Sequence, residues 1–353
     1  MREGDRLAAP AVGALTRGRV GAGSLAVVAL AVGLLVLLGV PFVGSGYVVR
    51  FLTELFMLIV LAQAWNLIGG LSGYISFGHV VFFGLGAYAT GLLMVRLGLP
   101  FAVALAGAAL LAVTFAVLIG LPILRLRGHY FAIATFGVAE GMRQIVTTAS
   151  GLTGGGMGLN VPPLRPPPFL AAALGGNVAA SSGLYYYLML ALLVATMLVT
   201  WLVMHRRLGF GLRAIRADED AAAVLGVDCT RYKTIAFALS ALFPALAGGI
   251  YAIWFSYIDP VTVFGLNFSV TMVIMTLLGG IGTLWGPVVG GVLLSVVGEV
   301  LWGKFLELHS AFLGAVLVLV VIFLPRGVVA TAREGRKALT PAAIRRNLRR
   351  YSV

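Results

Sequence analysis

The chain has 353 residues, of which 60% are hydrophobic and 10% are charged, and its mean hydropathy is +1.04. Soluble domains carry about 25% charged residues, so this composition indicates an integral membrane protein. The formal charge of +13 is spread over loops between apolar segments, which favours a topological role and argues against nucleic-acid binding. One cysteine excludes an internal disulfide, and four scattered histidines show no metal-ligand spacing.

Long apolar segments predict an all-α, polytopic membrane fold, because a helix needs about 20 mostly apolar residues to cross a bilayer. We expect about ten spans, at residues 25–40, 51–68, 77–97, 101–124, 129–148, 185–204, 234–257, 268–281, 286–302 and 309–325. The pair 268–281 and 286–302 is short, so it predicts either one long helix or a broken, re-entrant hairpin. The first span follows arginines without a small-residue cleavage site, which favours a retained anchor over a signal peptide.

The basic residues predict how the chain is oriented in the membrane. With ten spans and the N-terminus inside, the inner side holds 20 of the 25 Lys and Arg residues. The outer side holds the other five, which are Arg50, Arg96, Arg165, Lys304 and, near its edge, Arg143. This asymmetry satisfies the positive-inside rule and places both termini in the cytoplasm. The chain then divides into an N-terminal segment (1–23), a transmembrane domain (24–325) and a basic tail (326–353). Within the domain, loop 205–233 faces the cytoplasm and loop 149–184 faces outward.

The inner loop 205–233 contains the signals of a short helix. Asp218 is a suitable N-cap, and the acidic residues that follow it lie where the helix dipole favours negative charge. Gly226 is a suitable residue just beyond the C-terminal end. We expect this helix to present Ala222 and Leu225 on one face, which would fit a groove on another protein.

Several polar and ionisable residues lie inside the predicted spans, where they are costly and therefore candidates for function. The ionisable ones are Glu54, Glu140, Arg143 and Glu299. Glu140 and Arg143 are three residues apart, so they share a helix face and either form a packing salt bridge or line a polar pathway. The same two interpretations stay open for the uncharged or neutral residues Gln63, Asn66, Ser76, His79 and Thr135.

The remaining segments give weaker signals. Loop 149–184 is rich in Gly and Pro, and we interpret it as a surface loop or as a docking loop for an external partner. Its Gly154–Gly156 run lacks the preceding strand and following helix of a phosphate loop. The tail has Ile344, Leu348 and Tyr351 opposite arginines, which predicts either an interfacial helix on anionic lipid or a disordered basic tail. Ser72 and His129 match an intramembrane serine protease only loosely, because no helical context aims them at one another.

The inner loop also carries a resemblance to a known family. Asp220-Ala221-Ala222, followed after three residues by Gly226, resembles the Glu-Ala-Ala-x-x-x-Gly signature of ABC-importer permeases, with Asp in place of Glu. The wider chain resembles branched-chain amino acid permeases of the LivM class. The motifs are Leu71-Ser-Gly-Tyr-Ile-Ser-Phe-Gly-His79, Arg127-Gly-His-Tyr-Phe-Ala-Ile-Ala-Thr135, Leu152-Thr-Gly-Gly-Gly156, Gly209-Phe-Gly-Leu-Arg-Ala-Ile-Arg-Ala-Asp218 and Leu278-Gly-Gly-Ile-Gly-Thr-Leu-Trp-Gly-Pro287.

This resemblance implies a non-enzymatic permease subunit in the bacterial inner membrane. It would pair with a homologous second permease, two ATP-binding subunits and an external solute-binding protein. No cofactor is expected in this chain, since ATP and Mg would bind to the partner subunits and no Walker A motif is present. The expected solute is a branched-chain or other hydrophobic amino acid. The alternatives are urea or short amides carried by the same class, and an ion-coupled carrier or channel that works alone.

The resemblance also suggests which residues act. Coupling to the ATP-binding subunit is assigned to Arg213, Asp218, Asp220, Ala222, Leu225 and Gly226. The translocation pathway is assigned to Asn66, Ser76, His79, Tyr130, Thr135, Glu140 and Arg143.

Overall fold

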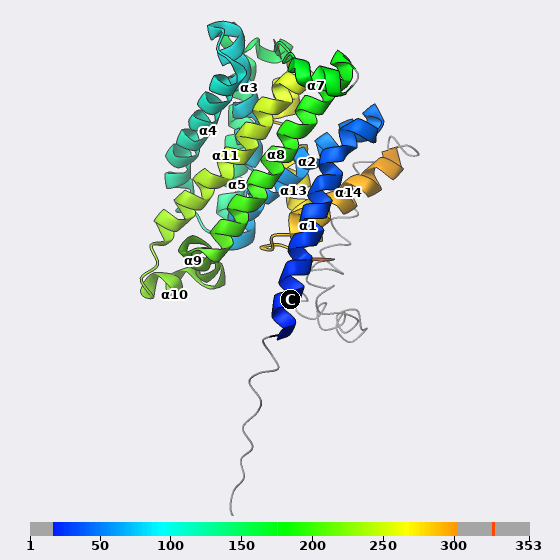
Figure 1. Cartoon of the computed structure of the whole chain (residues 1–353). Coiled ribbons are helices and arrows are strands. Elements are labelled where there is room, and N and C mark those ends of the chain that lie inside the picture. The colour runs from blue at the N-terminus through cyan, green and yellow to red at the C-terminus, as the bar shows by residue number, and fades with distance from the viewer. Residues whose placement is uncertain (1–16, 175, 303–326, 329–353) are drawn as a thin grey trace, which may run out of the picture.

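The computed structural model describes residues 17–174, 176–302 and 327–328 (Figure 1). They form a helical bundle with one pair of two-residue strands. The long helices are α1 (Arg17–Val43), α2 (Gly46–Trp65), α3 (His79–Leu97), α4 (Phe101–Ile123), α5 (His129–Thr148), α8 (Asn177–His205), α9 (Arg207–Ala217), α11 (Cys229–Phe255), α13 (Leu266–Gly279) and α14 (Gly286–Trp302). The short elements are the π-helix η1 (Asn66–Gly70), α6 (Ser150–Thr153), the 3₁₀-helix η2 (Gly155–Met157), β1 (Leu159–Asn160), α7 (Pro168–Ala173), α10 (Glu219–Val224), β2 (Tyr257–Ile258) and α12 (Pro260–Val263).

The predicted polytopic, helical fold is confirmed, but the count of ten spans is not. Among the described residues, six segments are long and apolar enough to cross a membrane: Gly46–Gly70, His79–Leu97, Phe101–Ile123, Ala179–His205, Cys229–Phe255 and Pro260–Gly279. Val28–Val43 and Gly286–Glu299 are shorter apolar helices. Helix α5 has the predicted bounds but is too polar to belong to the six. The predicted span 309–325 and the amphipathic pattern of the tail lie outside the described residues.

Several helices begin earlier than their apolar runs. Helix α1 starts at Arg17, inside the predicted N-terminal segment, and continues through Pro41. Helix α2 starts at Gly46, where the Ser45 side chain accepts a hydrogen bond from the backbone N–H of Val48. Arg50, counted above as a residue of an outer loop, therefore lies inside α2. Helix ends are set by such caps, whereas hydropathy marks only the apolar part of a helix.

Helix α11 lies at the centre of the bundle, packed against α3 and α4, while α2 packs against α8 and α13. The axes of α3 and α11 come close because small residues face one another. A Cβ on Gly86 would overlap the backbone of Ala245, and a Cβ on Gly248 would overlap the carbonyl of Phe83. Small residues at such contacts let helix backbones approach closely, as in other membrane bundles.

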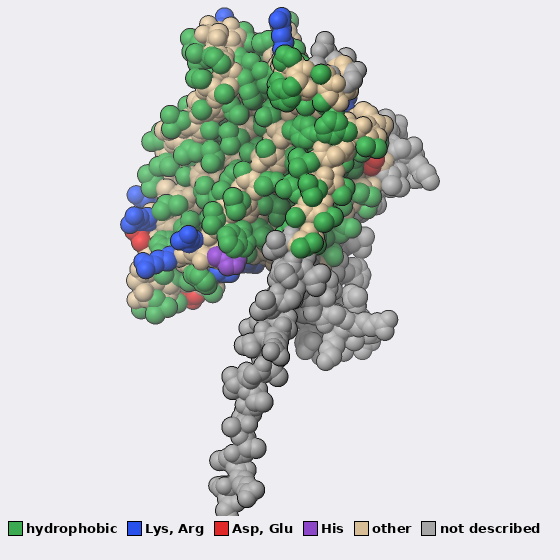
Figure 2. All heavy atoms as spheres, viewed as in Figure 1, with side chains coloured by type: hydrophobic (Ala, Val, Ile, Leu, Met, Phe, Trp, Pro, Cys, Tyr) green, Lys and Arg blue, Asp and Glu red, His purple; other side chains and the backbone are tan. Residues whose placement is uncertain are grey.

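The uncertain segment 268–302 is two helices joined by a tight turn. Helices α13 and α14 pack against each other, and the backbone of Gly286 lies where a Cβ on Gly279 would be. The predicted outer loop is also folded, since β1 pairs antiparallel with β2, Leu159 opposite Ile258. At the other end of the bundle, α9 and α10 lie together. Figure 2 shows basic and acidic side chains gathered at that end, below a broad apolar belt.

Candidate functional site

The predicted short helix in the inner loop is present as α10. The Asp218 carboxylate accepts hydrogen bonds from the backbone N–H groups of Asp220 and Ala221, each at 2.9 Å, and so caps its first turn. Gly226 follows the helix with a φ of +85°, a conformation that favours glycine. The predicted cap and stop residues are therefore both confirmed.

The predicted exposed face of α10 is wrong in one residue. Ala222 is only 2% exposed, because it packs into the hydrophobic core. The outward side carries Val224 and Leu225 instead, which are 88% and 83% exposed. Helical spacing alone does not say which side of a short helix meets its own domain. The apolar side chains available to a partner are thus Val224 and Leu225.

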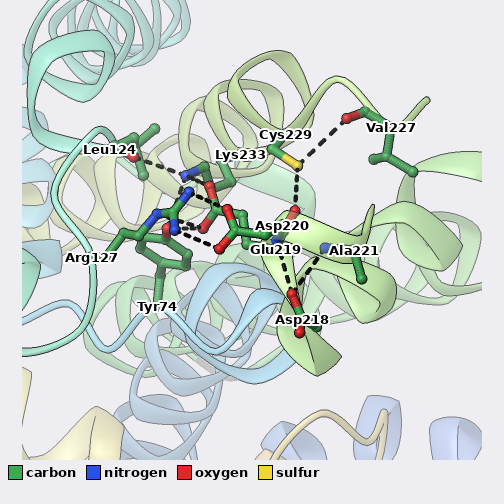
Figure 3. Close-up of polar contacts among 10 residues, drawn as sticks. All are labelled: Tyr74, Leu124, Arg127, Asp218, Glu219, Asp220, Ala221, Val227, Cys229 and Lys233. Atoms are coloured by element: carbon green, nitrogen blue, oxygen red, sulfur yellow. Dashed lines mark hydrogen bonds and ion pairs between the residues drawn. The ribbon is translucent and has the colours of Figure 1, made fainter. Parts of the chain in front are cut away.

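A buried lysine joins α10 to three other parts of the chain (Figure 3). The ammonium of Lys233, in α11, donates to the Glu219 carboxylate at 2.7 Å, to the Tyr74 hydroxyl at 2.9 Å and to the Leu124 carbonyl at 2.9 Å. The side chain of Lys233 is 3% exposed. An ammonium has three N–H donors, and all three are satisfied here. The Tyr74 hydroxyl in turn donates to Glu219, which closes a ring of three polar side chains.

A second ion pair extends this network to the surface. The guanidinium of Arg127, between α4 and α5, donates two hydrogen bonds to the Asp220 carboxylate, at 2.8 and 3.1 Å. Its Nε atom lies 3.9 Å from Glu219. A bidentate pair fixes the relative orientation of its two groups. We call Tyr74, Arg127, Glu219, Asp220 and Lys233 the clamp, because together they attach α10 to the membrane domain.

The clamp favours charged carboxylates. Burial opposes ionisation of Glu219, but hydrogen bonds from Lys233 and Tyr74 and the nearby positive charges outweigh it and hold its pKa below the usual value. The hydrogen bond from Arg127 likewise lowers the pKa of Asp220. Burial, together with the Glu219 carboxylate, raises the pKa of the Tyr74 phenol, so it stays protonated and can donate. The two carboxylates of the clamp are therefore charged at neutral pH.

Helix α9 makes a second connection, to the glycine-rich breaks in the bundle. Arg216 donates to the Gly70 carbonyl at the end of η1. Next to it, the Asn66 side chain accepts from the N–H of Gly282 at 2.8 Å and donates to the Thr283 carbonyl at 2.9 Å. The π-helix η1 and the turn between α13 and α14 thus contact each other, next to Arg216 of α9. We call this contact of η1 with the turn between α13 and α14 the glycine crossing.

Arg213, a predicted coupling residue, closes the junction between α8 and α9. It donates to the carbonyls of Gly209 and Met204, at 3.2 and 2.8 Å, and its guanidinium lies 4.8 Å from the ring centre of Phe210. These contacts shape the loop and leave the outward face of α10 to other residues.

Four of the predicted pathway residues are buried and make packing contacts. Asn66 belongs to the glycine crossing, and Ser76 accepts from the N–H of Gly78. His79 lies 3.0 Å from the Ser240 hydroxyl, and Thr135 accepts from the N–H of Phe77. The contacts of Asn66, His79 and Thr135 join segments that are distant in the sequence, whereas that of Ser76 is local. All four favour the packing interpretation.

The other three predicted pathway residues lie on α5. Tyr130 is exposed near its start, and Glu140 and Arg143 form the expected ion pair between neighbouring turns. The structure does not bring these three side chains together with the four buried pathway residues. The pathway assignment of all seven residues remains a prediction.

Sequence reasoning missed most of the clamp. Tyr74, Arg127, Glu219 and Lys233 were not singled out, and neither was Arg216. The useful signal was Lys233 itself, a basic residue at the start of an apolar helix, which needs a partner when buried. Its partners lie 14, 109 and 159 positions away along the chain, so spacing could not identify them.

Comparisons with known proteins agree with this architecture. The Escherichia coli (strain K12) high-affinity branched-chain amino acid transport system permease protein LivM is 32% identical over 320 residues, which cover 86% of this chain and 75% of that protein. LivM of Salmonella typhimurium is 30% identical, over 84% of this chain and 73% of its own length. LivH of E. coli (strain K12) is 29% identical over a shorter stretch, 38% of this chain and 44% of that protein. No solved structure matches at a significant level.

The chain also matches a protein family over most of its length. Residues 47–321 match the family described as "Branched-chain amino acid transport system / permease component". That range includes the clamp, the glycine crossing and all six spans apart from the first residue of the first one. This chain belongs to the branched-chain amino acid permease family of ABC importers, and within it resembles the LivM class.

Proposed function

We propose that this permease forms one half of the pathway of an importer for branched-chain or other hydrophobic amino acids, and that α10 couples it to a separate ATP-binding subunit. The printed names of the relatives support the solute class. Because the chain is similar to both LivM and LivH, its partner permease is a homologue of this chain. Two ATP-binding subunits carry ATP and Mg, and an external binding protein delivers the solute.

The observation that carries this proposal is the two-sided construction of α10. On one side, Glu219 and Asp220 are held by the clamp to α11, to the segment before α3 and to the connection between α4 and α5. On the other side, the Val224 and Leu225 side chains are 88% and 83% exposed. An exposed apolar tip on a firmly attached helix can receive a displacement and pass it to several helices at once.

The end of the molecule that carries α10 also indicates how the protein is oriented in the membrane. Basic residues of α8–α11 lie at this end, and the ion pair of Arg127 with Asp220 places Arg127 there as well. Positive charge favours the cytoplasmic side, where the ATP-binding subunits act. The N-terminal segment and the basic tail belong on this side, and the tail contacts anionic lipid.

The test uses the purified complex of both permeases and the ATP-binding subunits in proteoliposomes. Leu225→Glu places a charge in the centre of the proposed docking surface, and we expect it to abolish ATP-dependent leucine uptake and to release the ATP-binding subunits. The control Leu97→Glu changes an exposed leucine at the opposite end and should keep the subunits bound. Uptake unchanged in Leu225→Glu would show that α10 is not the coupling element.

The solute is tested separately with the cognate binding protein. Leucine, isoleucine, valine, urea and short amides are compared by calorimetry. We expect binding of the three amino acids only. Binding of urea or an amide in their place would assign the permease to a different solute while leaving its coupling role intact.

A further inference from the structure

A cavity of about 710 Å³ lies between α2, the α12–α13 segment and α14. Its α2 side runs from Tyr47 to Leu58, whereas the far end of that span, at Gly70, contacts α9. The cavity is therefore in the half of the bundle opposite α10. Pockets for small ligands have volumes of about 300–1,000 Å³, so this one is large enough for a single metabolite.

One arginine and two glutamates line the cavity: Arg50 and Glu54 on α2, and Glu299 on α14. The span that contains α2 has 25 residues. At a rise of about 1.5 Å per residue, Glu54 lies roughly 12 Å from its start and therefore within the apolar zone. Ionisable groups at such depth are costly against lipid and face a polar pathway instead. Arg50 and Glu54 are four residues apart, so both point from the same face of α2 into the cavity.

Two of these three charged side chains have no close partner among the described residues. Glu299 accepts a hydrogen bond from the Tyr47 hydroxyl. Among the described residues, neither Arg50 nor Glu54 forms a hydrogen bond or a close ion pair. The guanidinium of Arg50 lies 6.0 Å from the ring centre of Phe255, and Glu54 interacts with Arg50 and Glu299 only through longer-range electrostatics. The Ser295 hydroxyl also lines the cavity. It is buried and has no hydrogen-bond partner among the described residues.

Apolar side chains also line the cavity, together with the polar residues Thr262, Asn267 and Thr271. Leu58, Phe268, Met275 and Leu294 come from α2, α13 and α14, and Leu294 is buried. The cavity thus combines one guanidinium, two carboxylates and an aliphatic wall. Its opposed charges match the two ends of a zwitterion, and its wall matches an apolar side chain.

We propose that this cavity binds a hydrophobic α-amino acid in transit through the membrane domain. The Arg50 guanidinium receives the carboxylate, because its planar fork matches two oxygens. Glu54, with Glu299 near it, receives the α-ammonium group. The side chain of the solute lies against Leu58 and Met275. This site rests on the proposed importer function and deepens it, since a urea or amide permease has no use for opposed full charges.

The experiment compares Arg50→Gln and Glu54→Gln with the matched control Arg96→Gln. Arg96 lies in the last turn of α3 and outside the cavity, with its side chain donating to the Gly151 carbonyl. Each variant is purified with its partner subunits and reconstituted in proteoliposomes. Initial leucine uptake is measured with saturating leucine-loaded binding protein, alongside ATP hydrolysis and the subunit content of the complex.

We expect both cavity variants to take up leucine at least 10-fold more slowly per ATP hydrolysed, with all subunits present. Arg96→Gln should stay within twofold of the wild type. Uptake in both cavity variants equal to that of the control would overturn the site while leaving the importer function standing. Loss of the partner permease from the variants would also overturn it, because the cavity face would then be a subunit interface. A wild-type complex that takes up no leucine would instead reject the importer function.

Discussion

The two ends of the molecule use charge in opposite ways. At the α10 end, Glu219 and Lys233 are enclosed, and each of their polar atoms has a partner in the clamp. At the other end, Arg50 and Glu54 open into a cavity and have no close partner among the described residues. Charges that satisfy one another hold a shape, whereas charges left open can bind a ligand. The clamp is therefore a mechanical element and the cavity is a binding element.

The largest expected effect is on the free energy of unfolding. It is seen by comparing two variants, each of which removes one carboxylate from one end of the molecule. Glu219→Ala leaves the Lys233 ammonium buried with one acceptor lost, which costs about 3–5 kcal/mol when a buried pair is broken. Glu54→Ala removes an exposed group without a close partner, and a surface change of this kind stays within about 0.5 kcal/mol. Thermal unfolding of the detergent-solubilised protein measures both variants.

The double variant Glu219→Ala/Lys233→Met is the control for this interpretation. Replacing a buried ion pair by apolar residues is often neutral, so most of the lost stability should return. A double variant as unstable as Glu219→Ala would mean that the loss came from packing and not from an unpaired lysine.

The next effect concerns the glycine crossing, which connects the clamp end to the centre of the bundle. In Gly70→Ala, the new methyl group would overlap the Asn66 side chain and lie 2.9 Å from the backbone nitrogen of Gly282. Overpacking of this kind costs about 1–3 kcal/mol. We expect slower uptake at a retained rate of ATP hydrolysis, because the new methyl group would force η1 away from the turn between α13 and α14.

Gly137→Ala is the matched control, since a Cβ at Gly137 in α5 meets nothing within 4 Å. It should leave uptake unchanged. Equal uptake in Gly70→Ala and Gly137→Ala would show that the crossing tolerates an extra methyl group and does not transmit the movement.

Local signals explain what could be predicted from the sequence. Asp218 and Gly226 act on their nearest neighbours along the chain, so the ends of α10 could be placed without knowing the fold. Apolar length identified the helices α3, α4 and α14 in the same way. Glu54 and Glu299 stood out because charges are rare in apolar segments.

Contacts between distant segments explain what could not be predicted. The inward side of α10 depends on α9 and α11 packing behind Ala222. The partners of Lys233 are brought to it by the bundle and not by the local sequence. Arg50 was placed in a loop because it interrupts the hydropathy pattern, although the cap at Ser45 makes it helical. The errors at α10 and at Lys233 concern contacts set by tertiary structure, whereas the error at Arg50 concerns a local helix cap.

A smaller effect is expected from the exposed part of the clamp. Arg127→Ala breaks the bidentate pair with Asp220, which solvent and salt screen. We expect no measurable change in unfolding temperature and less than a twofold fall in leucine uptake per ATP, confined to low salt. Arg125→Ala, at a neighbouring exposed position, should show no salt-dependent difference. A severe loss in Arg127→Ala at high salt would assign this arginine a direct contact with a partner subunit.

The smallest effect is an absence of pH dependence near neutrality at the buried part of the clamp. The folded-state pKa of Glu219 lies below its usual value of 4.5. A depressed pKa contributes stability that is present above pH 4.5 and is lost as the pH falls through the lower folded-state value. The difference in unfolding temperature between the wild type and Glu219→Gln should thus be constant from pH 8 to pH 6.

Below pH 4.5 this difference should shrink, because the wild-type carboxylate becomes protonated whereas glutamine does not titrate. Unfolding temperatures of both proteins, recorded in detergent at each pH, give the curve directly. A difference that changes between pH 6 and pH 8 would mean that a clamp charge titrates near neutrality. The clamp would then respond to pH and could not serve as a fixed attachment for α10. Its hydrogen bonds require carboxylates that stay charged near neutral pH.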